Sequence, residues 1–447
     1  MPAKPGPAWP LTPHWATAVV LGMATLVVGL VLGRAELVVF AAPLLLTGAG
    51  ALLAPRLPGA RAAIDDDGGH RHSGRLRLPL ELDARGRLAV LYIDDGVGPG
   101  CSVLITGTER IGGGVAVDAE LPLSGRRELF SWQLATLSPD SCLGEVPRES
   151  RPVSVSVLPA VGKVGTGPLP KRLHGLTGSH ASRTPGEGAE FRDIHELTPG
   201  DSLRRIDWRA TARKGHEFGQ PYVRRTFATA EAAITLVVDA NDDLVPNTDA
   251  WLTRSPRKPT DIGSLHLLRE GAAAVAAGYL SQGDRVGLTE LVSYRRGLRA
   301  APGHRQLDHI RTRLMLLRPA VKVQRPAHDL ELVPGCVAIV FSTFMDADAA
   351  RLMAIWQRLG HPVLGVDILP WLSVLPADPV QQLAVRMVLA ERKASLTGLR
   401  DLGIPVLGWR GEVPGGTPIL SLDSVEGQIP LAAGLELART RLRGAAS

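Results

Sequence analysis

Two uncharged apolar runs near the N-terminus constrain this chain more than any other feature. The first, Trp15 to Gly33, and the second, Leu37 to Pro55, each hold nineteen residues without a charged side chain. At a rise of about 1.5 Å per residue, a helix of this length crosses the roughly 30 Å hydrocarbon core of a bilayer. Only Arg34 to Glu36 separate the runs, so the sequence predicts a tight two-helix transmembrane hairpin over residues 15–55.

A cleaved signal peptide is the alternative interpretation of the first run. It is disfavoured because only one basic residue, Lys4, precedes the run and because a second apolar run follows at once. Gly29 and Gly33 also form a GxxxG spacing, which lets two membrane helices approach closely.

Basic residues on the two sides of the runs predict an orientation. The turn between the runs holds a single arginine, whereas four arginines follow the second run: Arg56, Arg61, Arg71 and Arg75. Cytoplasmic flanks are the more basic ones. We therefore expect a multi-pass protein of the inner (cytoplasmic) membrane, with residues 1–14 as a cytoplasmic tail and the soluble domains also in the cytoplasm.

The remaining length divides into regions of different pattern, as expected for a chain of 447 residues, which is too long for one ordinary core. Over residues 75–160, short alternating apolar runs with glycine and proline between them predict a small all-β sandwich. Residues 161–190 are rich in glycine, proline, serine and threonine, and we interpret them as a linker. Residues 413–447 are assigned to a C-terminal extension.

Residues 231–412 alternate apolar strands with helices and predict a doubly wound α/β sheet. The run AAITLVVDAN ends in Asp239 and has the continuous apolar character of a strand buried on both faces. Helices are expected at about 264–282 and 379–402. Ligands of such sheets bind beyond the carboxyl ends of the strands, which is where Asp239 falls.

A basic segment, residues 191–230, precedes the α/β domain, and its centre reads GDSLRRIDWRATARKG. Because carboxylates and arginines alternate here around a tryptophan, we expect a charged clasp that staples the segment onto the α/β domain. The residues of this clasp are Asp201, Arg204, Asp207 and Trp208. The basic residues in excess of the local acids are expected to dock a partner protein or anionic membrane lipid. These partner-binding residues are Arg205, Arg209, Lys214 and Arg224.

The block from Phe191 to Lys214, followed by LVVDAN, resembles bacterial proteins that carry the "domain of unknown function 58". Its GDxxRxIDW core consists of Gly200, Asp201, Arg204, Ile206, Asp207 and Trp208. The resemblance implies a membrane hairpin, a β-rich domain and a von Willebrand factor A-like domain, in that order. It also implies a partner, since such proteins are thought to serve MoxR-type AAA+ ATPases as cofactors or membrane adaptors.

The same resemblance raises the question of a metal ion. Von Willebrand A-like domains often bind Mg²⁺ through a DxSxS loop after the first strand. Here that loop holds Asp239, Asn241 and Asp243, so both hydroxyls are replaced. The strand expected to end in Ser-Asp reads Ser342-Thr343, so the usual distal aspartate is missing. Asp346 follows three residues later and could substitute for it only if the loop bends back. Two interpretations stay open: a degenerate Mg²⁺ or Ca²⁺ site, or an acidic loop that caps backbone amides.

The sequence holds no Walker A loop, GxSxG elbow or HExxH motif, so ATP hydrolysis by this chain is not expected. No helix-turn-helix, RNP-like or zinc-finger pattern accompanies the basic segment, which disfavours nucleic acid as a partner. The sequence therefore predicts a membrane-anchored, non-enzymatic adaptor or assembly factor. The alternative is a divalent-metal-dependent hydrolase that acts at the Asp239 loop.

Overall fold

The computed structural model forms two compact units, which are described separately: Met1–Pro122 with Arg126–Val157, and Leu123–Gly125 with Leu158–Ser447. The structure describes residues 11–53, 61–64, 74–83, 87–94, 100–107, 111–121, 123–138, 141–144, 148–149, 152–170, 173, 178–214, 220–252, 261–291, 296–319, 332–373, 376–411 and 429–444. Most of the expected N-terminal tail and the first part of the expected C-terminal extension lie outside these ranges.

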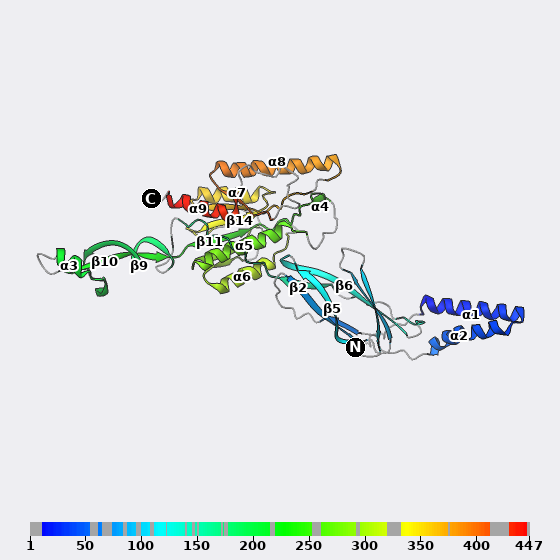
Figure 1. The fold of residues 1–447 in the computed structure, drawn as a ribbon. Coiled ribbons are helices and arrows are strands. Elements are labelled where there is room, and N and C mark those ends of the chain that lie inside the picture. The colour runs from blue at the N-terminus through cyan, green and yellow to red at the C-terminus, as the bar shows by residue number, and fades with distance from the viewer. Residues whose placement is uncertain are drawn as a thin grey trace, which may run out of the picture. The chain divides into compact units, whose positions relative to one another are not determined.

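The first unit begins with two apolar helices, α1 (Pro13–Leu32) and α2 (Ala35–Leu53), which lie side by side (Figure 1). Thr12 caps α1 by accepting a hydrogen bond from the Trp15 N–H at 3.3 Å, and Gly33 ends it at a φ of 62°. Both helices are long and apolar enough to cross a membrane. The expected hairpin is therefore present as two adjacent helices, whose membrane location rests on length and composition.

Glycines line the contact between α1 and α2. A Cβ atom added at Gly29 would lie 3.0 Å from the Leu37 Cβ, and one added at Gly48 would lie 2.7 Å from the Val19 Cγ2. Gly33, the expected partner of Gly29, instead faces open space and serves as the helix end. Close approach thus depends on glycines of both helices rather than on the GxxxG pair of one.

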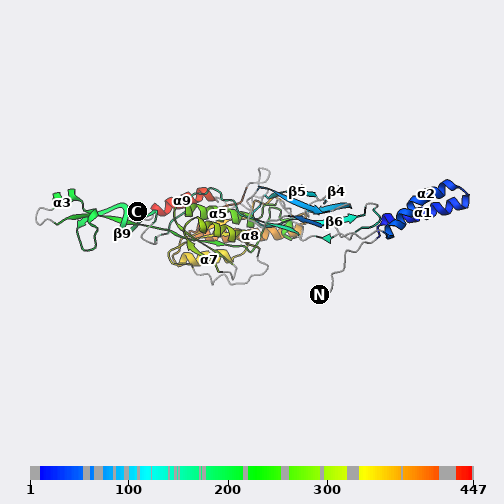
Figure 2. The same ribbon diagram turned by 90° about the horizontal axis from the view of Figure 1, so that it is seen from below.

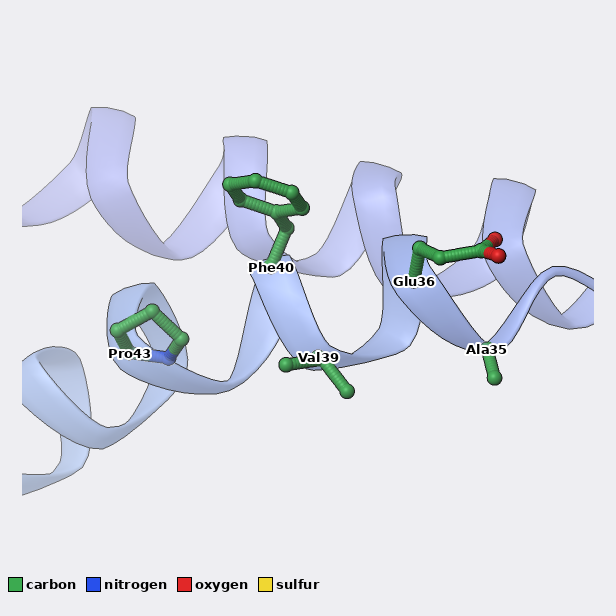
Figure 3. Close-up of a pocket in the computed structure, with 5 residues that line it drawn as sticks. All are labelled: Ala35, Glu36, Val39, Phe40 and Pro43. Carbon is green, nitrogen blue, oxygen red and sulfur yellow. The ribbon is translucent and has the colours of Figure 1, made fainter.

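The outward surface of α2 carries a shallow apolar hollow (Figure 3). The side chains that line it are Ala35, Glu36, Val39, Phe40 and Pro43. Val39 and Phe40 are 70% and 72% exposed. In a water-soluble helix such side chains usually face a core, so the exposure of these two neighbouring residues fits a surface that contacts lipid.

Two mainly antiparallel sheets complete the first unit, with strand orders β1-β2-β5 and β4-β3-β6-β7, where β8 also pairs with β6. Their strands are β1 (Arg61–Ile64), β2 (Gly74–Asp83), β3 (Arg87–Asp94), β4 (Cys101–Gly107), β5 (Ile111–Leu121), β6 (Gly125–Leu137), β7 (Arg148–Glu149) and β8 (Val153–Val157). Apolar residues of both sheets, such as Leu78 and Val157, form one core. The expected β-rich domain is present, and β1 lies ahead of its expected start.

The second unit is built on a seven-stranded sheet with the order β13-β12-β11-β14-β15-β16-β17. Its strands are β11 (Ala233–Val238), β12 (Arg285–Glu290), β13 (Leu298–Ala301), β14 (Val337–Ser342), β15 (Val363–Asp367), β16 (Val406–Gly408) and β17 (Ile429–Pro430). Neighbouring strands are parallel, except that β13 is antiparallel to β12. With β11 as the first strand, this is the order of a doubly wound fold.

Helices cover both faces of this sheet (Figure 1). One face packs on α5 (Ser264–Ser281), α6 (His304–Met315) and α9 (Leu431–Gly444), and the other on α7 (Asp348–Arg358) and α8 (Pro379–Asp401). A short helix, α4 (Asp249–Leu252), follows β11. Leu236 of β11 faces the first core and Val237 the second, which explains the continuous apolar run in the sequence.

The C-terminal boundary of the α/β fold differs from the expected one. Strand β17 and helix α9 lie within residues 413–447, yet both belong to the α/β unit. Leu431 and Leu435 of α9 are 1% and 0% exposed and join the same core as α5. This part of the expected extension is therefore structural.

A two-stranded antiparallel ribbon, named the arm here, extends from the second unit (Figures 1 and 2). It consists of β9 (His180–Glu196) and β10 (Tyr222–Ala230), and it carries a 3₁₀ turn, η1 (Leu203–Arg205), and helix α3 (Trp208–Lys214). At its base, the His180 Nε2 lies 2.8 Å from the Asp284 Oδ1. The expected linker thus becomes a strand from His180 onward, and the expected basic segment, residues 191–230, contains the end of β9, η1, α3 and β10.

Candidate functional site

Polar loops follow the neighbouring strands β11 and β14 at their carboxyl ends. Asp239 comes directly after β11, and its Oδ2 accepts a hydrogen bond from the Ser342 Oγ at 2.6 Å. Its Oδ1 accepts from the Asn241 N–H at 3.2 Å. The strand order reverses between β11 and β14, so these side chains lie where doubly wound sheets bind their ligands.

Asp346 bends back toward the same edge. Its Oδ2 accepts from the Asn241 Nδ2 at 2.9 Å, and its Oδ1 accepts from the Asp348 N–H at 3.1 Å at the start of α7. The reversal uses Phe344, whose φ of 54° is rare for a non-glycine residue and whose N–H donates to the Ser342 Oγ at 2.9 Å. The loop therefore brings to the edge a carboxylate more than one hundred residues away in sequence.

These carboxyl groups influence one another electrostatically. Burial, with the negative charge of Asp346 as the second cause, raises the pKa of Asp239 to about 7, against the opposing hydrogen bonds from Ser342 and Asn241. The same two causes raise the pKa of Asp242. An edge of this kind either holds a proton near neutral pH or attracts a cation.

The three residues expected to bind a metal separate into two groups. Asp243 turns away, and its Oδ1 accepts from the Leu265 N–H at 3.1 Å in the first turn of α5, as the capping interpretation predicts. Asp239 and Asn241 stay together with Asp346. We call Asp239, Asn241, Ser342 and Asp346 the edge cluster.

The edge cluster fits a divalent cation only in part. Its oxygen atoms are the ligand type that Mg²⁺ and Ca²⁺ prefer, and the buried Asn241 Oδ1 has no hydrogen-bond partner. Within the described ranges, however, no group of three or more His, Cys, Asp or Glu side chains is arranged to hold a metal ion. A cation here would depend on amide and hydroxyl oxygens, or on oxygens from a binding partner.

The arm holds the residues of the expected clasp, but they pair differently. Asp201 pairs with Arg225 of β10, with 3.0 Å between the Arg225 Nη2 and the Asp201 Oδ2, and not with Arg204. The Asp201 carboxylate also accepts from the N–H and Oγ1 of Thr198. These hydrogen bonds hold the pKa of Asp201 well below its usual range. The clasp therefore closes the arm on itself and does not staple it onto the α/β sheet.

Asp207 and Trp208 also take other roles than expected. The Asp207 Oδ1 accepts from the N–H groups of Arg209 and Ala210 at 3.1 and 2.9 Å, which caps the start of α3. Trp208 is 71% exposed, and Arg204 is exposed as well. Neither of these two side chains contributes to an internal clasp.

The four expected partner-binding residues lie in three different environments. Arg205 turns inward and donates to the Thr226 Oγ1 at 2.8 Å and the Gly186 O at 3.2 Å. The Arg224 guanidinium lies over the Phe191 ring, 5.3 Å from its centroid. Arg209 is exposed, and Lys214 ends α3 with a side chain outside the described residues. Of the four, only Arg209 clearly faces solvent without an internal partner.

Residues 193–378 match the family described as "Protein of unknown function DUF58". The chain therefore carries a DUF58 segment. The matched segment begins in β9 and ends at the residue before α8, so it contains both the end of the arm and the edge cluster. The two apolar N-terminal helices and the two sheets of the first unit lie outside it.

Relatives of this DUF58 chain occur in mycobacteria. It is 29% identical over 210 residues to "Uncharacterized protein Rv1480" of Mycobacterium tuberculosis and, equally, to "Uncharacterized protein Mb1516" of Mycobacterium bovis. The match covers 43% of this chain and 59% of each relative, less than two thirds of their length. The relatives' printed names state no activity.

One solved structure is also similar to the DUF58 chain. It is an active-site mutant of a family two carbohydrate esterase from Clostridium thermocellum, at 14% identity over 87% of this chain and 98% of that one. The TM-score of 0.17 is too low to support any argument about fold or activity.

Sequence reasoning missed a buried ion cluster near the edge. Asp367 ends β15 at 0% exposure, and its Oδ1 lies 2.5 Å from the Arg392 Nη2 of α8. The Arg392 Nε donates to the Thr343 O at 2.7 Å, which ties the loop after β14 to this pair. The sequence signal was an aspartate closing an apolar strand, the same signal that singled out Asp239.

Proposed function

We propose that this chain is a membrane-anchored, non-enzymatic adaptor that binds a partner protein at the carboxyl edge of its α/β sheet. The observation that carries the proposal is the edge cluster at the point where the strand order reverses. The two apolar N-terminal helices supply the anchor, and the soluble units face the cytoplasm.

Two features support a von Willebrand A-like description of the α/β unit. The parallel strands follow the doubly wound order with an antiparallel edge strand, β13. The aspartate after the first strand, Asp239, contacts Ser342 at the end of the fourth, and Asn241 contacts Asp346 between the two loops, as a cation site shared between loops requires. The partner of such a domain commonly completes the site with a carboxylate of its own.

The chemistry of the cluster favours binding over catalysis. The Ser342 hydroxyl is 0% exposed and donates to Asp239, so it is not presented to a substrate as a nucleophile. Asp239 is itself only 5% exposed. When a Mg²⁺ or Ca²⁺ ion is bound, Asn241, Asp239 and Asp346 are the residues that would hold it. The partner class proposed is a MoxR-type AAA+ ATPase.

The proposal can be tested by affinity purification of the full chain from its native membrane in mild detergent. One sample contains Mg²⁺-ATP and the other contains a chelator. We expect an AAA+ ATPase to co-purify with the unmodified chain and to be lost with Asp346→Asn. The matched control is Asp348→Asn, two residues away, whose side chain lies outside the cluster and only 3.7 Å from Arg351 on the surface of α7.

Two outcomes would contradict the proposal. If no ATPase co-purifies under any nucleotide condition, the proposed partner is wrong. If both variants capture the ATPase equally, the edge cluster is not its binding site. A divalent-ion-dependent hydrolysis that Asp239→Asn abolishes would instead identify the chain as an enzyme.

A further inference from the structure

The end of the arm separates side chains that hold it together from side chains that point outward. The internal group includes Asp201 with Arg225, Arg205 with Thr226, and Asp207 at the start of α3. The outward group contains exposed residues of η1 and α3. We call these residues the tip surface: Leu203, Arg204, Trp208, Arg209 and Arg213.

Hydrogen bonds fix the backbone beneath the tip surface. The Thr211 Oγ1 accepts from the Tyr222 N–H at 2.9 Å, and the Asp207 N–H donates to the Tyr222 O at 2.8 Å. Ile206 forms a β-bridge with Val223. Helix α3 is therefore attached to β10 at several points, and the outward side chains are held in place before any ligand arrives.

The tip surface combines large apolar side chains with uncompensated positive charge. Leu203 and Trp208 are 70% and 71% exposed. The two nearby acids are engaged, Asp201 by Arg225 and Asp207 by backbone amides. In the part of the chain that the structure describes, Arg204, Arg209 and Arg213 have no acidic partner. This composition resembles the interfacial side of a membrane-surface helix, with Trp and Leu between basic residues.

We propose that the tip surface binds an anionic phospholipid membrane. Leu203 and Trp208 enter the headgroup region, and the three arginines contact lipid phosphates. Helix α3, which carries Trp208, lies at the end of a projecting arm (Figures 1 and 2). A lipid surface suits this site better than a protein groove does, because a bilayer needs no matching shape. The contact is independent of partner binding at the edge cluster and adds to the attachment through α1 and α2.

The test uses the full chain held in phosphatidylcholine nanodiscs, with vesicles added in solution. Contact then does not depend on how the arm is placed relative to the hairpin. A Cys101→Ser background removes the exposed cysteine, and Leu203→Cys carries an environment-sensitive fluorophore. We expect its emission to shift to the blue with vesicles that contain phosphatidylglycerol and not with phosphatidylcholine alone, and the shift to be reversed by high salt.

Charge variants identify the residues responsible. Arg204→Ala/Arg209→Ala should weaken vesicle binding roughly 30-fold, from about 1 kcal/mol for each basic residue near an anionic surface. The matched control, Arg351→Ala/Arg358→Ala, removes the same charge from α7 and should bind normally. Equal binding by the two double variants would overturn the proposal, as would a fluorophore that stays in water with both kinds of vesicle. Loss of ATPase capture with Arg204→Ala/Arg209→Ala, without loss of lipid contact, would make the tip surface a protein-docking site.

Discussion

At the scale of single residues, Asp239 couples its protonation to folding. Its pKa lies near 7 in the folded chain against an ordinary value of 3.8, so the folded chain holds this proton more tightly than the unfolded chain. The stabilisation is complete below about pH 4 and is lost as the pH rises through about 7. Between about pH 5 and about pH 8, the free energy of unfolding should fall, by at most about 3 kcal/mol. In Asp239→Asn, which has no carboxyl proton to lose, the free energy of unfolding should fall less over the same pH range.

Cys336 offers a local probe for this measurement. It is 1% exposed next to the start of β14, so its alkylation after a urea pulse, quenched at a common pH, reports unfolding of the α/β unit. Asp348→Asn serves as the control and should keep the wild-type pH dependence. Identical pH dependence in Asp239→Asn would show that the proton is not held at Asp239. Added Mg²⁺ should stabilise only the wild type at the higher pH if a cation replaces the proton.

Arg205 and Arg209 carry the same charge in the same motif but occupy different environments. Arg205→Ala removes hydrogen bonds to the Thr226 Oγ1 and the Gly186 O, and we expect a loss of about 1–3 kcal/mol in the local stability of the arm. Arg209→Ala removes an exposed side chain and should change that stability by less than about 0.5 kcal/mol. Hydrogen exchange of the β9 and β10 amides distinguishes the two, and equal protection in both variants would contradict the inward role of Arg205.

The sequence pattern pointed to the position of the candidate site but not to the full set of side chains that form it. Asp239 could be predicted because it closes an apolar strand. Asp346 could be considered only on the condition that its loop bends back, because its position depends on the reversal at Phe344. The contact of Ser342 with Asp239 depends on the pairing of β14 with β11. Asp243 lies apart from the edge cluster because its carboxylate accepts a hydrogen bond from a backbone N–H at the start of α5. Arg225 replaced Arg204 opposite Asp201 because strand pairing in the arm sets which side chains meet.

At the scale of elements, the same composition can describe a linker or a strand. The glycines of β9 suggested an extended linker, yet they serve close packing against β10. A Cβ added at Gly186 would lie 2.4 Å from the Ala228 Cβ, and one added at Gly188 would lie 2.3 Å from the Phe227 O. Elements of the α/β unit such as β11 and α5 were easier to predict, because each has a long apolar run or face with its own period.

The two membrane-type helices provide an element-scale prediction. A side chain at Gly48 would collide with Val19 across the helix contact, whereas one at Gly50 would meet nothing within 4 Å. We expect Gly48→Leu to separate α1 from α2 at a cost of about 1–3 kcal/mol and Gly50→Leu to leave them packed.

Cys142 reports this separation in the full chain. Its side chain is 1% exposed and packs in one cluster with Ala51 of α2 and Trp15 of α1. Alkylation of Cys142 in detergent, followed by mass spectrometry, should be faster in Gly48→Leu than in the wild type and unchanged in Gly50→Leu. Equal rates in all three proteins would mean that the glycine contact does not hold the hairpin together.

At the scale of the whole molecule, the order of the regions along the chain was easier to predict than the residues at which each region begins and ends. Helix α9 escaped sequence analysis because its apolar positions are few and interspersed with alanine and arginine. Its burial depends on the sheet face that α5 leaves uncovered. Tertiary context of this kind is not visible in a local pattern.

Charges that flank the two helices predict an orientation for the chain. Four arginines follow α2, at Arg56, Arg61, Arg71 and Arg75, against Arg34 alone in the turn. Because basic flanks stay in the cytoplasm, a fluorescent protein fused after Ser447 should fluoresce and alkaline phosphatase fused there should be inactive. Replacing the four arginines with alanine while changing Glu36 to lysine should raise phosphatase activity, since the turn then becomes the more basic side. High phosphatase activity in the unmodified fusion would instead place the edge cluster and the arm outside the cytoplasm, where no AAA+ ATPase could reach them.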